Sequence, residues 1–150
     1  CLQALVAGPA IAARARRAMR SGRKSRLSED LHLTGEAVYE AAVAGDELAM
    51  TILHETGRYL GIGIANMLNT LNPARVIIGG GVANAAEFIM EPLRKAVAAR
   101  ALETSSRATS IVTAQLGDGA AAIGAVTLVL HQLFVPDYSK TSVKHATTTV

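Results

Sequence analysis

The sequence predicts an α/β fold in which helices pack on a small sheet that contains parallel strands. Helical periodicity dominates residues 2–71, and two short runs rich in β-branched residues, 75–78 and 109–114, then alternate with helical segments. Strands separated by a helix usually pair in parallel, and the crossover between them should be right-handed. Half of the residues are hydrophobic, but only 3% are aromatic and none is Trp. We therefore expect a core built from Ala, Val, Ile and Leu.

The first part of the chain predicts three short helices. Residues 2–6 form the first, and Pro9 suits the first turn of the second, residues 10–19, because its missing N–H would be unpaired there anyway. A polar loop follows. Thr34 begins the third helix, since a Thr cap followed by an acidic residue in the first turn, Glu36, is a typical helix start.

The longest helix is expected at residues 47–71, after Gly45-Asp46 has stopped the third helix and capped this one. The helical spacing of its leucines and isoleucines indicates a buried face. Three glycines lie inside it, at positions 57, 61 and 63. Each costs a helix about 1 kcal/mol relative to Ala, so they indicate that another backbone or a ligand comes close.

The second half of the chain alternates strands and helices. The expected elements are a strand at 75–78, a helix at 85–101 that kinks or restarts at Pro92, a strand at 109–114, a turn at 116–119 and a helix at 120–134. We expect residues 1–134 to form one domain. Residues 135–150 are polar and lack periodicity, so we expect a flexible tail.

Composition excludes several classes of protein. The single cysteine, Cys1, excludes an internal disulfide and a metal site made from a cysteine pair within this chain. It is compatible with the cytoplasm, where we place the protein. No apolar run reaches the roughly 18 residues of a membrane span. The net charge of +3 permits anionic partners such as nucleotides but does not require them.

Two glycine-rich segments are candidates for ligand binding. Gly79, Gly80 and Gly81 follow the first strand, where a backbone without Cβ atoms lets N–H groups approach an anion or a flat ring. They match neither a Walker loop nor a G-x-G-x-x-G motif, and a plain turn is the alternative. Residues 117–125 start the last helix, whose first N–H groups could face a nucleotide or simply be capped.

Other polar side chains give weaker signals. The four histidines do not stand at metal-ligand spacing on one helix, and no nucleophile with a base partner is evident. We therefore assign no catalytic residue. A basic cluster could contact nucleic acid, but a solvated helix face and loop is the simpler interpretation. Its members are Arg14, Arg16, Arg17, Arg20, Arg23, Lys24 and Arg26.

Taken in order, five segments resemble the ROK family of sugar kinases and sugar-responsive repressors. They are residues 1–9, 42–49, 61–73, 77–82 and 117–125, and the resemblance covers about residues 1–134. It implies one lobe of an actin-like ATPase (ribonuclease H-like) fold, the carboxyl-terminal one. In the family, sugar and ATP bind between two lobes, and the catalytic Asp and first phosphate loop precede the part that these residues match.

The resemblance also implies roles for individual residues. Gly79, Gly80 and Gly81 match the segment that lines the nucleotide, which is ATP with magnesium in the kinases. Gln3 stands where the family has a sugar-binding Glu; Gln keeps one acceptor oxygen but loses the charge, so sugar binding should weaken. Cys1 matches the last zinc cysteine. The other ligands, two Cys and a His, are not in this sequence, so zinc binding would need upstream residues.

These expectations leave three functions open. The first is the carboxyl-terminal lobe of an ATP-dependent kinase of a hexose or an N-acetylhexosamine, inactive without the upstream Asp. The second is the effector domain of a sugar-responsive repressor, which would contact DNA only through a separate N-terminal domain. The third is a structural or oligomerisation fragment. The resemblance suggests a homodimer in either of the first two cases.

Overall fold

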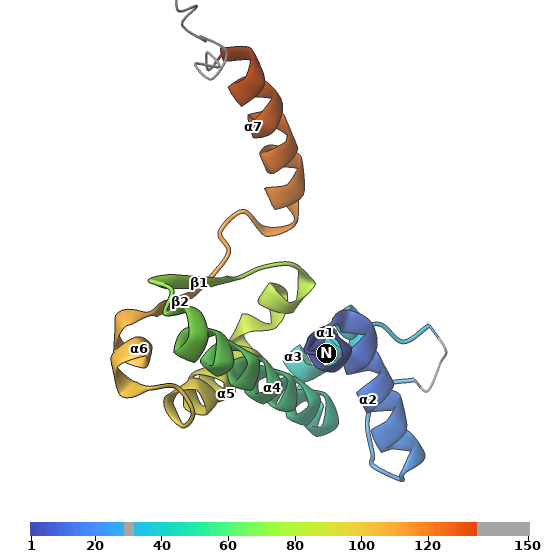
Figure 1. The fold of residues 1–150 in the computed structure, drawn as a ribbon. Helices are drawn as coiled ribbons and strands as arrows, with labels where there is room; N and C mark the ends of the chain where they lie inside the picture. The colour runs from blue at the N-terminus through green and yellow to red at the C-terminus, as the bar shows by residue number, and fades with distance from the viewer. Residues whose placement is uncertain (29–31, 135–150) are drawn as a thin grey trace, which may run out of the picture. The chain divides into compact units, whose positions relative to one another are not determined.

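The computed structural model describes residues 1–28 and 32–134, and the chain divides into two compact units, Cys1–Gly117 and Asp118–Val150. The predicted tail, residues 135–150, lies outside the described residues. Helices and two strands make up the first unit (Figure 1). In chain order they are α1 (Gln3–Val6), α2 (Gly8–Arg20), α3 (Gly35–Val43), α4 (Glu47–Leu71), β1 (Arg75–Ile78), the 3-10 helix η1 (Gly81–Ala85), α5 (Ala86–Ala98), α6 (Glu103–Ala108) and β2 (Ser110–Thr113).

The helix starts follow the predicted caps. The Thr34 hydroxyl accepts a hydrogen bond from the Ala37 N–H at 3.1 Å at the start of α3. Asp46 does the same for the Ala49 N–H at 2.8 Å at the start of α4. At the other end of α4, Asn72 takes a left-handed conformation with φ of 44°, which stops the helix before Pro73. The bounds of α4 match the prediction.

The long helix α4 lies side by side with α5, and two of its glycines make that approach possible (Figure 1). Gly57 and Gly61 face the α5 backbone at Ile89 and Leu93, both of which are fully buried. Gly63 instead faces the Leu2 side chain beside α1. The expected close approach is therefore confirmed, and another backbone, not a ligand, makes it at Gly57 and Gly61.

The two strands pair in parallel and in register, with Arg75 opposite Ser110 and Ile78 opposite Thr113. Their inward side chains join a core cluster on α4 and α5. Its members are Ile64, Leu68, Ile78, Leu93 and Val97, with Val76 and Ile111 packed against them. The predicted parallel sheet is confirmed.

The connection from β1 to β2 differs from the prediction in several places. The expected single helix at 85–101 begins as a 3-10 turn, η1, and becomes α-helical only at Ala86. The α-helix ends at Ala98, before the predicted end at 101, and of the kink or restart predicted at Pro92 the restart does not occur, because the helix continues through it. The short helix α6 was not predicted. Its sequence is mostly polar and only Ser105 is buried, so it lacks an apolar pattern that would reveal it.

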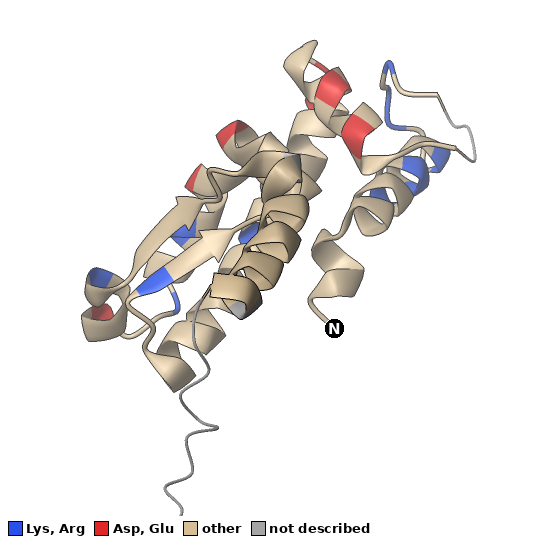
Figure 2. Ribbon diagram, turned by 90° about the horizontal axis from the view of Figure 1, so that it is seen from above, with Lys and Arg blue, Asp and Glu red and all other residues tan. Residues whose placement is uncertain are grey.

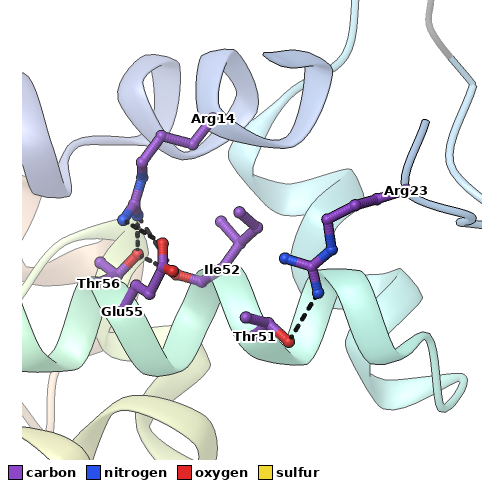
Figure 3. A network of polar contacts seen from close by, with 6 residues as sticks. All are labelled: Arg14, Arg23, Thr51, Ile52, Glu55 and Thr56. Atoms are coloured by element: carbon purple, nitrogen blue, oxygen red, sulfur yellow. Dashed lines mark hydrogen bonds and ion pairs between the residues drawn. The ribbon is translucent and has the colours of Figure 1, made fainter. Parts of the chain in front are cut away.

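One member of the basic cluster is not a solvated side chain. Arg14 of α2 crosses to α4, where it donates to the Thr56 hydroxyl and to the Ile52 carbonyl, the latter at 3.3 Å, and pairs with Glu55 at 3.6 Å (Figure 3). Its guanidinium lies 5.4 Å from the centre of the Tyr59 ring. Burial lowers the pKa of Arg14, and Glu55 opposes that effect. Arg14 therefore ties α2 to α4.

The second unit contains the last helix, α7 (Ala120–Phe134), at the bounds that the sequence predicts. A short 3-10 turn, η2 (Gly117–Gly119), precedes it. Across the part of the chain that the structure describes, no helix combines the length and hydropathy that crossing a membrane requires.

Candidate functional site

The glycine segment lies at the carboxyl edge of the parallel sheet. Gly79 follows β1 directly, and Ala114 follows β2. The Ala114 N–H donates to the Ile78 carbonyl at 2.8 Å, so the two segments leave the sheet together. A Cβ on Gly79 would lie 3.6 Å from the Ala114 Cβ, an ordinary contact. Ligands of open α/β sheets gather at this edge, because loops from neighbouring strands meet there.

The backbone requires glycine at Gly80. Its φ of 71° and ψ of −172° lie in a region that essentially only glycine occupies. Its carbonyl then accepts the Ala83 N–H at 2.9 Å and begins η1. The bend turns the chain sharply away from the strand and presents successive peptide groups without side chains.

The backbone does not require glycine at Gly79 or Gly81, because neither has a positive φ. Nothing in the first unit lies within 4 Å of the position that a Cβ on Gly80 or Gly81 would take. The fold therefore leaves open space beside bare peptide groups at the sheet edge. This arrangement suits a flat ring or an anion that approaches the main chain closely.

Gln3 and Cys1 lie elsewhere in the first unit, on or beside α1, which packs against α2 and α4. Both are exposed, and Cys1 is a free thiol. Within residues 1–28 and 32–134 the Gln3 carboxamide makes no hydrogen bond, so its donors and acceptor are available. Neither residue lies within 4 Å of the Cβ positions of Gly79, Gly80 or Gly81. The structure therefore places Gly79 beside Ala114 but does not bring Gln3 to the three glycines.

Cys1, the predicted zinc ligand, is an exposed free cysteine. Among the described residues there is no group of three His, Cys, Asp or Glu side chains that could hold a metal ion. Structural zinc takes four ligands in a closed tetrahedral site. Residues 1–28 and 32–134 therefore do not make a zinc site by themselves.

A hollow that the sequence did not reveal lies between α3 and described residues of the loop that precedes it. Its volume is about 490 Å³. The loop and one side of α3 supply its lining, so no sequence motif marks it. The lining residues are Arg26, Leu27, Ser28, His32, Leu33, Ala37, Glu40, Ala41 and Ala44.

Comparison with known proteins finds one family model and relatives that are sugar kinases or sugar-related regulators. The sequence model of the ROK family matches residues 1–132. A glucokinase of Halalkalibacterium halodurans is 33% identical over 136 residues, which are 88% of this chain and 41% of that protein. The DNA-binding transcriptional dual regulator NagC of Escherichia coli is 31% identical over 129 residues, which are 86% of this chain and 31% of that protein.

A solved structure supports the same assignment. The ROK family glucokinase from Streptomyces griseus, in complex with glucose and AMPPNP, superimposes with a TM-score of 0.73 at 28% identity. The match covers 85% of this chain and 44% of that one. The predicted fold class, an actin-like ATPase lobe with helices on a small parallel sheet, is thereby confirmed. The chain spans less than half of each of these three relatives.

Proposed function

The chain belongs to the ROK family, and on that premise we propose that it is the sugar- and nucleotide-binding carboxyl-terminal lobe of an ATP-dependent sugar kinase. The acceptor would be a hexose or an N-acetylhexosamine. The observation that carries the proposal is the bend at Gly80, whose bare and open backbone lies at the carboxyl edge of the sheet. A relative with this fold is known in complex with glucose and AMPPNP, which supports it.

The proposed roles follow from chemistry and position. Gly79, Gly80 and Gly81 would line the nucleotide, since a Cβ there would fill the open space beside the peptide groups. ATP would arrive with magnesium, which supplies positive charge to the phosphates. Gln3 would contact sugar hydroxyls through its free carboxamide, more weakly than a carboxylate would. Zinc would involve Cys1 only if upstream residues supplied the remaining ligands.

The isolated chain of 150 residues should not phosphorylate a sugar. Within these residues we assign no catalytic base, and the resemblance puts that Asp upstream. The assay is phosphate transfer from ATP with magnesium to glucose or to N-acetylglucosamine, followed by chromatography of the sugar phosphate. Turnover by the purified chain would contradict this assignment of roles.

Nucleotide binding tests directly whether the glycine segment at 79–81 lines the nucleotide. Gly81→Ala should weaken AMPPNP binding about tenfold, because the new methyl group would occupy the ligand's space. A tenfold loss of affinity corresponds to about 1.4 kcal/mol of binding free energy. Thermal stability should be unchanged, since Gly81 has ordinary φ and open surroundings. Binding is measured by isothermal titration calorimetry with magnesium present.

Gly8→Ala is the matched control for this experiment. Gly8 is also open and has no positive φ, but it lies at the start of α2, away from the sheet edge. The Gly8→Ala chain should bind AMPPNP with the affinity of the original chain. Equal affinity of the Gly81→Ala and Gly8→Ala chains would show that nucleotide does not bind at the glycines.

The repressor function remains as a second candidate for two reasons. Gln3 lacks the carboxylate that favours tight sugar binding, and the regulator NagC is among the relatives. A sugar-responsive regulator needs to bind a sugar but not to transfer phosphate. Calorimetry with sugar alone and with nucleotide alone separates the two, since only the kinase lobe should bind AMPPNP. We propose a homodimer for either function.

A further inference from the structure

Positive charge is concentrated in one short stretch of the chain. Residues 14–30 contain seven Lys and Arg side chains and two carboxylates, whereas the rest of the chain contains eight and ten. The net charge of the whole molecule is only +3. Figure 2 shows the basic residues gathered on the C-terminal half of α2 and the loop after it. This one region is therefore strongly basic on an otherwise slightly acidic molecule.

Five of these side chains are exposed and form what we call the arginine patch: Arg17, Arg20, Arg23, Lys24 and Arg26. Among the residues that the structure describes, none of the five pairs with a carboxylate. Arg23 donates to the Thr51 hydroxyl at 3.5 Å, and Arg26 donates to the Ala44 carbonyl at 3.1 Å. Both acceptors are neutral, so these two hydrogen bonds bring no negative charge to the arginine patch.

The end of α2 explains only part of this charge. Arg17 and Arg20 lie in the last turn of the helix, where cations interact favourably with the helix dipole. Arg23 and Lys24 follow after the helix has ended at Ser21, and the dipole effect falls off within one turn. Helix stability therefore does not account for the full patch.

The side chains around the patch restrict the kind of partner. Residues 8–28 contain no aromatic residue, so the patch offers no surface on which unpaired bases could stack. The apolar side chains of α2, Ile11 and Met19 among them, are buried. A protein interface usually has an apolar centre inside a polar rim, and the patch provides none.

We propose that the arginine patch binds the phosphate backbone of duplex nucleic acid without reading its sequence. Guanidinium groups present a planar fork that matches phosphate oxygens, and four of the five cations are arginines. The end of α2 and the basic stretch 23–26 that follows it can contact neighbouring phosphates of a duplex, as backbone contacts that position a protein do. This contact is separate from the proposed sugar and nucleotide function and does not depend on it.

The test is fluorescence anisotropy of a labelled random-sequence DNA duplex of about 20 base pairs with the full chain. About four phosphate contacts predict that affinity falls roughly 100-fold between about 50 and 200 mM NaCl. Arg20→Gln/Arg23→Gln should remove two contacts and reduce that fall to roughly tenfold. Arg100→Gln/Arg107→Gln removes the same charge from exposed positions near α6 and should leave the salt dependence unchanged.

Three results would overturn the proposal. They are no duplex binding at about 50 mM NaCl, equal loss of binding in the two double variants, and tighter binding to polyglutamate than to the duplex. The last result would assign the patch to an acidic protein instead. Far-UV circular dichroism checks that the variants fold. If Arg20→Gln/Arg23→Gln does not fold, Lys24→Gln alone should reduce the dependence of affinity on salt by the equivalent of about one phosphate contact.

Discussion

Gly57→Ala and Gly61→Ala should each destabilise the fold by about 3 kcal/mol or more, since overpacking a helix contact against backbone leaves no side chain that can yield. A Cβ on Gly57 would lie 2.9 Å from the Ile89 Cα and 2.8 Å from the Pro92 ring. A Cβ on Gly61 would lie 3.0 Å from the Leu93 Cα. In both cases it would also overlap a carbonyl oxygen of α5. Helices α4 and α5 would have to separate.

Urea denaturation followed by far-UV circular dichroism measures the loss, and Gly63→Ala is its control. The three atoms nearest to a Cβ on Gly63 all belong to the Leu2 side chain, whose methyl groups can move. Because Ala is the better helix former by about 1 kcal/mol, Gly63→Ala should be nearly neutral or stabilising. Three variants of equal stability would mean that α4 and α5 do not approach as closely as described.

The fold was predictable where a residue acts locally. Helix caps such as Thr34 and Asp46 work through hydrogen bonds three residues away, so the sequence reveals them. The strand at 75–78 follows from its β-branched run. The glycines of α4 predicted a close approach but not the partner, because the contact with α5 joins residues some thirty positions apart.

Arg14 and the site glycines show where prediction from sequence stops. In the sequence, Arg14 looks no different from the exposed arginines that follow it. Only the packing of α2 on α4 brings it to Thr56. The three glycines of 79–81 are equivalent in the sequence. The structure distinguishes them, since only Gly80 needs its positive φ and Gly81 is free to carry a side chain. That difference makes the nucleotide test possible.

Asp46 holds together two parts of the chain that lie some twenty residues apart. One carboxylate oxygen accepts the Ala49 N–H at 2.8 Å and caps α4. The other accepts the Arg26 N–H at 2.6 Å and the Ser25 hydroxyl at 2.9 Å, which fixes the loop after α2. The side chain is buried. Burial alone would raise the pKa of Asp46, but the hydrogen bonds from Arg26, Ala49, Ser25 and Leu48 outweigh it and lower the pKa.

Asp46→Ala should therefore cost about 3 kcal/mol at neutral pH, from a lost cap and from buried donors left without an acceptor. Asp46→Ser keeps a cap for α4 but does not reach the loop, so it should recover about 1 kcal/mol of that loss. Urea denaturation of the three proteins gives both values. Equal stability of the Ala and Ser variants would mean that the cap contributes nothing.

The contribution of Asp46 should also depend on pH in one direction. Because the pKa is lower in the folded state, the stabilisation is complete above the unfolded pKa of about 4 and disappears as the pH falls through the folded value. The stability difference between the original chain and Asp46→Asn should thus be constant from neutral pH down to about 5 and shrink below about 4. A difference that persisted unchanged in acid would show that the Asp46 charge is not what the loop and the helix recognise.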